Sequence, residues 1–260
     1  EENGYKTIAL DWLGRWHKRG YKEYIDVVNK FNKPTLSTKI KNKIMNNIYK
    51  FLNTYKPDNE AEKVTDKAIE IIDKYKNDKF FLFIHYWDVH TPYFPPKKYI
   101  YSDKQNSGDN RKIKEMLNEI GNIDWKNTLK NITIGVETIQ DIINRYDGAI
   151  KFVDYNIGRL FDFLKDAGIL ENTLLIITSD HGESLGEHGI YFDHHGLYDE
   201  SIKVPLIFYY SQLKSQKINA TIQHIDIMPT ILDILKIRYN KENNLVTISS
   251  SLNKPEIQKW

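Results

Sequence analysis

The sequence predicts an α/β fold in which a mixed, mostly parallel β-sheet is sandwiched by helices. Short apolar runs at 80–86, 172–178 and 204–209 are typical of strands buried on both faces. Helical stretches with an apolar stripe alternate with these runs, and the longest covers 136–166. Because this alternation is characteristic of sheets with helices on both sides, the observations together predict the fold class.

Size, charge and cysteine content limit the function classes. The chain has 260 residues, enough for one large domain with a substantial core. Its 37 Lys and Arg against 35 Asp and Glu give a net charge of +2, which argues against nucleic-acid binding. No apolar run reaches the roughly 18 residues of a membrane span. The lack of cysteine excludes a disulfide framework, a thiolate zinc site and a cysteine nucleophile within this chain.

Cysteine content does not fix the compartment, because a chain without cysteine is tolerated in reducing and oxidising locations alike. A cytoplasmic location is our expectation. The first residue, Glu1, is not methionine, so a signal peptide could lie upstream of it.

The first 78 residues predict structural elements rather than chemistry. Residues 1–4 resemble the end of a helix capped by Gly4, and 5–9 resemble a short strand, so we expect a chain that is incomplete at its N-terminus. Apolar residues then recur at helical spacing in two amphipathic stretches. The first contains Ile40, Ile44, Ile48, Phe51 and Leu52, and the second contains Val64, Ala68, Ile71, Ile72 and Tyr75.

Later elements follow from turn and capping residues. The polar stretch 97–132 predicts an exposed insertion. Gly168 is placed to end the helix at 136–166, and Asp226 is placed to begin a helix that runs to residue 235. The end of the chain loses this periodicity. We therefore expect a main domain over 1–240 and an irregular tail, or the start of a further segment, over 241–260.

Histidines gather where two of the predicted strands end. Ligands of open α/β sheets bind outside the carboxyl ends of the strands. Five of the eight histidines follow the runs at 80–86 and 172–178, namely His90, His181, His188, His194 and His195. Imidazoles grouped beside carboxylates suit a metal ion or an anion, so this end of the sheet is the candidate site.

Asp180 and His181 are the strongest candidates for metal ligands. Gly182 allows the backbone to turn sharply, so that both side chains can face one ion. One carboxylate and one imidazole suit calcium, magnesium, manganese or zinc. The alternative is a capped loop in which Asp180 binds backbone amides and His181 is exposed. The apolar strand before the pair and the histidine-rich loop after it favour the metal site.

Each of the remaining candidate site residues could instead have a purely structural role. His90 lies in a loop stiffened by three prolines, so it is either presented to a ligand or packed against Trp87 or Tyr93. His194 and His195 are either site residues or exposed loop residues. Three other side chains have similar alternatives: His188 as a turn residue, Glu183 as a supporting or solvated carboxylate, and His17 as part of a basic rim or an exposed loop.

Several motifs in order carry a family resemblance. The segment 175–189, with Ser-Asp-His-Gly-Glu at its centre, resembles the sulfatase family of the alkaline-phosphatase superfamily. So does 81–93, which contains Trp-Asp-Val-His-Thr-Pro-Tyr. The resemblance covers most of residues 1–12 and 78–235, and its further segments are 145–155, 196–207 and 226–232.

The resemblance implies an alkaline-phosphatase-like fold and hydrolysis of sulfate monoesters. Such enzymes bind a divalent cation, usually Ca²⁺ with Mg²⁺ or Mn²⁺ as alternatives, and Asp180 and His181 match the later pair of ligands. His90 matches a histidine that contacts the sulfate and assists the leaving group. A lysine or histidine with a similar role matches His194 or His195, and the spacing from Pro205 favours His194.

The nucleophile of this family is a formylglycine hydrate, made from Cys or Ser in a Cys/Ser-x-Pro-x-Arg motif by a formylglycine-generating enzyme or maturase. This chain contains no cysteine and no Ser-x-Pro-x-Arg, and the early acidic metal ligands are not identifiable. In the family both lie upstream of the segment that resembles 1–10. We therefore expect this chain alone to be inactive and to bind metal weakly.

Two other functions stay open at this point. A phosphate or phosphonate ester hydrolase of the same superfamily shares the Asp-His-Gly element but uses a Thr or Ser nucleophile. The loop at 87–92 and the Ser-Ile-Lys-Val-Pro-Leu stretch at 201–206 favour the sulfatase. A non-catalytic module that binds a metal or an anionic glycan is the second alternative, and the upstream sequence would distinguish them. The side chains of the chain do not identify the sulfate ester.

Overall fold

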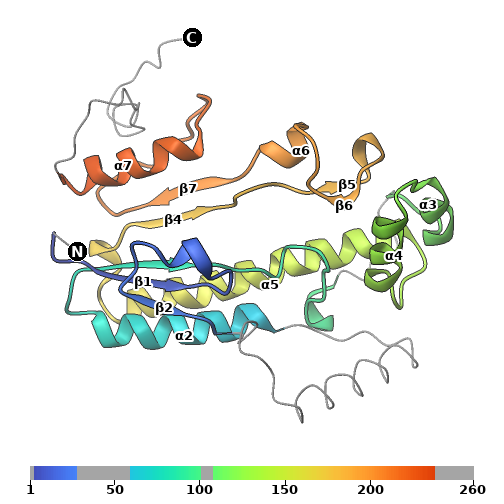
Figure 1. The fold of residues 1–260 in the computed structure, drawn as a ribbon. Coiled ribbons are helices and arrows are strands. Elements are labelled where there is room, and N and C mark those ends of the chain that lie inside the picture. The colour runs from blue at the N-terminus through green and yellow to red at the C-terminus, as the bar shows by residue number, and fades with distance from the viewer. Residues whose placement is uncertain (1–2, 28–58, 101–107, 238–260) are drawn as a thin grey trace.

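The computed structural model describes residues 3–27, 59–100 and 108–237 (Figure 1). The helical stripe expected at 40–52 and the tail expected at 241–260 lie outside these residues. The described part combines helices with parallel and antiparallel strands, which confirms the predicted α/β class.

Three short strands form a parallel sheet in the order β2-β1-β3. They are β1 (Lys6–Leu10), β2 (Glu23–Ile25) and β3 (Phe80–Ile84). In this register, Leu10 lies opposite Ile25 on one side and Ile84 on the other. The carboxyl ends of all three strands therefore meet at one edge of the sheet, where a ligand site is expected.

The other four strands in the described part of the chain pair antiparallel. β4 (Leu175–Thr178) pairs with β7 (Leu206–Tyr209), and β5 (Ser184–Leu185) pairs with β6 (Tyr191–Asp193). β4 and β7 confirm the strands expected at 172–178 and 204–209, with shorter bounds. The β5-β6 hairpin carries the chain from the end of β4 to the histidine-rich loop.

Two long helices pack beside β1 (Figure 1). They are α2 (Glu60–Tyr75) and α5 (Ile139–Asp166), as the apolar stripes predict. α5 begins with a capping box, because the Thr138 hydroxyl accepts the Asp141 amide at 3.2 Å and the Asp141 carboxylate accepts the Thr138 amide at 2.8 Å. The helix ends before Gly168, whose φ of +70° is the left-handed conformation expected after a helix.

α5 passes three apolar clusters along its length. Near its C-terminal end, Leu160 and Leu164 pack against β1 and α2. In its middle, Phe152 and Val153 belong to a second cluster. At its N-terminal end, Ile139 joins a third cluster that reaches the loop after β3 and strand β6. One helix therefore connects the core under the parallel sheet to the segments that carry the histidines.

The remaining helices are short. The α-helices are α3 (Ile113–Glu119), α4 (Ile123–Ile132), α6 (Asp199–Ile202) and α7 (Ile227–Ile234). The 3-10 helices are η1 (Arg15–Lys18), η2 (Lys97–Tyr99), η3 (Leu170–Asn172), η4 (Glu187–Gly189) and η5 (His224–Asp226). α7 confirms the helix expected after Asp226. None of the helices in the described ranges is long and apolar enough to cross a lipid bilayer.

Part of the region 97–132 is packed rather than exposed. Met116 of α3 and Leu129 of α4 are fully buried, and both belong to the cluster around the start of α5. The two residues lie in a polar stretch without an apolar repeat, so the sequence did not predict their burial. Most of the other residues in these two helices are exposed, so each helix buries only one side.

Strand β3 is covered on one face rather than two. Leu82 and Ile84 of β3 pack against the core under α2 and α5. Phe81 and Phe83 point to the other face and are 37% and 40% exposed. The ring of Tyr21 lies 6.2 Å from both of these phenylalanine rings. An unbroken apolar run does not reveal which face is covered, so burial of both faces of β3 was wrongly expected.

Candidate active site

The loop after β3 presents His90 beside an indole. The His90 ring stacks on Trp87 with centroids 4.2 Å apart and planes 17° apart. Its Nδ1 lies 2.6 Å from the Thr91 carbonyl, which fixes the ring orientation. His90 is thus both packed against Trp87, as one interpretation expected, and directed toward the histidines of other segments.

The turn after β4 places His181. Its Nδ1 lies 2.7 Å from the Gly182 carbonyl oxygen. Gly182 is needed for space: a Cβ there would lie 1.9 Å from the Glu200 carbonyl oxygen, and the Gly182 amide donates to the Ser201 carbonyl at 2.7 Å. The sequence attributed this glycine to a sharp turn, and the structure gives the close approach of a second backbone as the reason.

His194 follows β6 and completes a group of three imidazoles. The His194 ring stacks on His181 at 3.9 Å, and the His90 ring lies 5.5 Å from His194 and 5.9 Å from His181. One ring nitrogen from each of the three lies within 4.8 Å of the others. Residues from three loops or turns, which follow β3, β4 and β6, therefore converge at one point, which we call the histidine cluster.

Carboxylates and imidazoles around His194 shift its pKa in opposite directions. Burial and the neighbouring His181 lower the pKa of His194, and His90 acts in the same direction. Glu183 and Asp193 act in the opposite direction and do not reverse the shift. His194 is therefore neutral at neutral pH, and its ring can hold a cation or accept a proton.

Asp180 lies next to the histidine cluster but points outward. Its side chain is 78% exposed, and its Oδ1 lies 3.8 Å from Nε2 of His181. The same oxygen accepts the His181 amide at 3.1 Å. Asp180 thus combines the backbone contact of the capped-loop alternative with a place beside His181.

His195 lies outside the histidine cluster. Its side chain is 80% exposed, and its Nδ1 lies 2.6 Å from Oδ1 of Asp193. Of these two neighbours, only His194 belongs to the histidine cluster. His188 is also outside: its ring stacks on Tyr198 at 3.9 Å, and its Nε2 lies 3.4 Å from Glu200.

Glu183 is a buried support for this site. Its side chain is 4% exposed, and it accepts hydrogen bonds from the hydroxyls of Tyr93 and Thr91, the latter at 2.8 Å. Burial and the nearby Glu183 carboxylate raise the pKa of Tyr93, so the phenol remains a donor. Oε2 of Glu183 lies 3.9 Å from Nδ1 of His194. Glu183 therefore ties the loop of His90 to the turn that carries His181.

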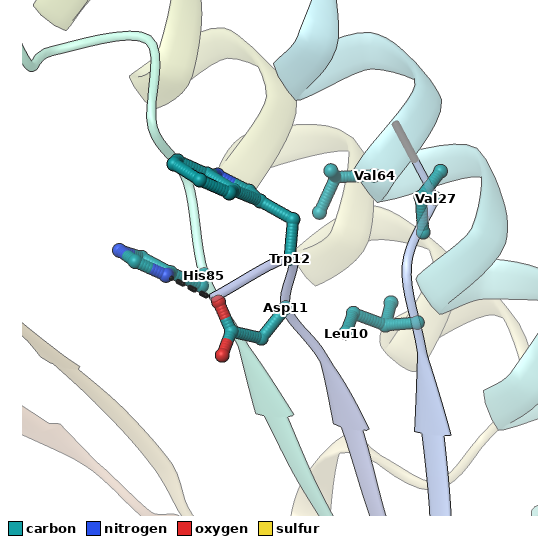
Figure 2. Close-up of a pocket in the computed structure, with 6 residues that line it drawn as sticks. All are labelled: Leu10, Asp11, Trp12, Val27, Val64 and His85. Carbon is teal, nitrogen blue, oxygen red and sulfur yellow. Dashed lines mark hydrogen bonds and ion pairs between the residues drawn. The ribbon is translucent and has the colours of Figure 1, made fainter. Parts of the chain in front are cut away.

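A second polar group, missed from the sequence, lies where β1 and β3 end. Asp11 is 4% exposed, and its Oδ1 lies 2.8 Å from Nδ1 of His85 (Figure 2). The Tyr24 hydroxyl and the Leu13 amide also donate to this carboxylate. His17, considered for an anion-attracting rim, is exposed, with Nδ1 4.0 Å from Asp11 Oδ2.

The Asp11 carboxylate is ionised in this environment. Burial alone would raise its pKa, but hydrogen bonds from His85, Tyr24 and Leu13 outweigh burial and lower the pKa to about 2. The sequence gave no signal for this group, because Asp11 and His85 lie 74 positions apart and meet only through strand pairing.

Comparison with known proteins identifies the family. The Sulfatase family model matches residues 1–237. The chain belongs to the sulfatase family. This sulfatase chain is 28% identical over 212 residues to a sulfatase of Formosa agariphila, in an alignment covering 78% of this chain and 41% of that protein.

A second relative matches a shorter region at higher identity. The sulfatase chain is 40% identical over 96 residues to an N-acetylglucosamine-6-O-sulfatase of Bacteroides thetaiotaomicron. This alignment covers 36% of the chain and 17% of the relative. The chain thus spans less than half the length of both relatives.

A solved structure confirms the fold. The sulfatase chain superposes with a TM-score of 0.61 on a protein solved in complex with its substrate D-glucosamine-2-N,6-O-disulfate. The match covers 96% of this chain and 62% of that protein, at 19% sequence identity. The alkaline-phosphatase-like arrangement expected from the sequence is therefore confirmed.

Proposed function

We propose that this chain is part of a sulfuric ester hydrolase whose sulfate ester lies at the histidine cluster. The observation that carries the proposal is the convergence of His90, His181 and His194, with ring nitrogens within 4.8 Å of one another. Membership of the sulfatase family supports the reaction type. The amino-sugar sulfates named for one relative and one solved structure support a sulfated glycan as substrate class.

The protein's own residues would orient the ester and manage protons. The contact of His90 Nδ1 with the Thr91 carbonyl leaves Nε2 to face the ligand. From there, His90 would contact a sulfate oxygen and assist the departing alcohol. His194, neutral because of its lowered pKa, would face the same group from the other side.

We propose that Asp180 and His181 hold a divalent cation, with Ca²⁺ preferred over Mg²⁺ and Mn²⁺. The exposed Asp180 carboxylate and the adjacent imidazole offer one oxygen and one nitrogen, 3.8 Å apart. A bound cation would polarise the sulfate oxygens. The fit is not unique, because three clustered imidazoles are a donor set that suits Zn²⁺.

The nucleophile of the intact protein is proposed to be a formylglycine produced by a formylglycine-generating enzyme or maturase. This chain has no cysteine and no Ser-x-Pro-x-Arg, so it contributes neither form of the precursor motif. The proposed reaction therefore belongs to the longer protein, to which this chain contributes the histidine cluster.

The activity test compares sulfate and phosphate esters. The full-length protein, co-expressed with a formylglycine-generating enzyme, is assayed with 4-nitrophenyl sulfate and 4-nitrophenyl phosphate. Sulfate hydrolysis that a chelator abolishes is expected. Hydrolysis of the phosphate ester alone would replace the proposal with the phosphohydrolase alternative.

Two neighbouring histidines provide a matched pair of variants. His194→Gln should lower kcat/KM for the sulfate by roughly a hundredfold or more, because it removes a ring from the cluster. His195→Gln should change it by less than about threefold, because that side chain is 80% exposed and turned to Asp193. Equal losses in both variants would contradict the assignment.

Calorimetric titration tests the metal ligands. Asp180→Asn in the full-length protein should weaken Ca²⁺ binding by roughly tenfold or more, because a charged oxygen ligand is lost. Unchanged Ca²⁺ affinity in the variant would exclude Asp180 as a ligand. Zn²⁺ binding lost in His90→Gln but kept in Asp180→Asn would assign the cation to the three imidazoles instead.

A further inference from the structure

The polar group at the ends of β1 and β3 has a geometry that a structural role does not require. Asp11, Tyr24 and His85 come from three neighbouring strand segments, and the carboxylate accepts from the tyrosine, the imidazole and the Leu13 amide. Replacing a whole buried ion pair by well-packed apolar residues is often neutral for stability. Here a buried carboxylate fixes the orientation of one imidazole, that of His85. This arrangement suggests that His85 has a functional role.

Asp11 determines how the His85 ring presents its second nitrogen. An ionised carboxylate only accepts hydrogen bonds, so Nδ1 of His85 carries the proton that faces Oδ1. In the neutral ring, Nε2 is then the acceptor. Figure 2 shows this nitrogen on the side of the ring away from Asp11.

Two indoles lie beside this imidazole. Trp12 and Trp87 contact each other edge to face with centroids 4.6 Å apart. The His85 ring meets Trp87 edge-on at 5.5 Å, and Trp87 stacks on His90 at 4.2 Å. His85 and His90 thus share Trp87 as a neighbour, so a ligand that contacts His90 lies near His85 as well.

We propose that His85, held by Asp11, forms a subsite for the sugar part of a sulfated glycan, in which Nε2 accepts a hydrogen bond from a sugar hydroxyl. Trp12 and Trp87 supply apolar surface for the C–H groups of the ring. The subsite rests on the proposed function, since it names the part of the substrate next to the ester. His85 is a binding residue in this scheme, and Asp11 is a positioning residue.

The kinetic test uses two sulfate esters that differ in hydroxyl groups. The full-length, matured protein is assayed with D-glucosamine 6-sulfate and with 4-nitrophenyl sulfate, which has none. His85→Gln and Asp11→Asn should each lower kcat/KM for the sugar sulfate roughly tenfold more than for the aryl sulfate, because one hydrogen bond to substrate is lost. The matched control is His188→Asn, which alters another histidine paired with a carboxylate and should keep the ratio.

A spectroscopic measurement separates positioning from folding. Imidazole ¹⁵N shifts should show His85 as the Nδ1–H tautomer, and Asp11→Asn should alter that pattern in a folded protein. Addition of D-glucosamine 6-sulfate should shift the Nε2 signal of the parent protein. If folded Asp11→Asn retains the Nδ1–H pattern, Asp11 does not position the ring.

The outcomes distinguish the subsite from the reaction. Equal losses on both esters in folded variants would overturn the subsite, and so would a wild-type protein that hydrolyses only the aryl sulfate. If neither sulfate is hydrolysed, the proposed function fails. The response of the Nε2 signal to the sugar sulfate then decides the subsite alone.

Discussion

Asp11 shows how a single buried charge is tolerated in this sheet. Its side chain is 1% exposed, so the carboxylate has lost nearly all contact with water. The hydrogen bonds from His85, Tyr24 and Leu13 replace that contact. Removing one partner would leave a buried acceptor without its donor, a loss that usually costs about 1–3 kcal/mol.

The lowered pKa of Asp11 makes the free energy of unfolding depend on pH. A carboxyl group with a pKa of about 2 in the folded state and 3.8 as its model value favours folding above pH 4. This contribution, about 2 kcal/mol, is lost as the pH falls from 4 toward 2.

Urea unfolding of the chain between pH 6 and pH 2 measures this dependence. Asp11→Asn should lower the free energy of unfolding at pH 6 and flatten its decline below pH 4. Other carboxylates with lowered pKa values, such as Asp141, contribute to both proteins and cancel in the difference. Identical slopes in parent and variant would rule out the assignment of the shift to Asp11.

At the scale of elements, the turn after β4 depends on the close approach of two backbones. A Cβ on Gly182 would lie 1.9 Å from the Glu200 carbonyl oxygen, a distance that no packed structure accepts. Gly182→Ala must therefore separate the turn from α6 (Asp199–Ile202) and displace His181. We expect a loss of about 2 kcal/mol or more in stability and weaker metal binding, measured by thermal unfolding and calorimetry.

Gly158 is the matched control for that substitution. It lies inside α5, and a Cβ there meets nothing within 4 Å. Gly158→Ala should stabilise the chain slightly, by about 0.5–1 kcal/mol, because alanine is the better helix former. If both alanine variants behave alike, close backbone approach is not what constrains residue 182.

The capping box of α5 is a second test at this scale. Thr138→Ala removes the hydroxyl that accepts the Asp141 amide and should reduce the free energy of unfolding by about 1 kcal/mol. Thr138→Ser keeps the acceptor and should lose less than half of that amount. A Thr138→Ala variant as stable as the parent would show that the cap contributes nothing.

Sequence reasoning located the histidine cluster but not the group around Asp11. His90, His181 and His194 follow strand ends or lie in the next loop, where a general rule for α/β sheets places ligands. Asp11 and His85 also follow strands, yet one lies in an ordinary hydrophobic-to-polar transition and the other at the end of an aromatic run. Their significance appears only when the register of β1 and β3 places them side by side.

The covering of the sheet was also beyond the sequence. The aromatic residues of β3 predict a strand, and the strand exists, but their alternation between two faces is hidden because both faces are apolar. Likewise, Met116 and Leu129 give no periodic stripe, and their burial follows from the position of α5. Burial of such residues is a property of tertiary packing rather than of local pattern.

At the scale of the whole molecule, the apolar faces of two strands are open to solvent. Phe83 of β3 is 40% exposed and Ile207 of β7 is 52% exposed. Exposed strands with apolar side chains favour association between chains. We expect the 260-residue chain to self-associate at micromolar concentration in sedimentation velocity experiments.

Charged substitutions at these two exposed positions test that expectation. Phe83→Lys and Ile207→Lys should shift the population toward monomer by severalfold while leaving the circular dichroism spectrum unchanged. Tyr155→Lys is the control, because that side chain is 53% exposed but belongs to helix α5 rather than to a strand. A monomeric parent chain, or an equal shift in the control, would refute the role of the strand face.

The length of α5 has a mechanical consequence. Its 28 residues extend for about 42 Å, and its two ends lie in different apolar clusters. We expect the continuous helix to couple the two clusters. If the contacts of one cluster are lost, the helix that also packs in the other cluster is destabilised. Amide hydrogens at both ends should therefore exchange through one common opening, so that the sheet and the histidine-bearing loops melt as a single cooperative unit.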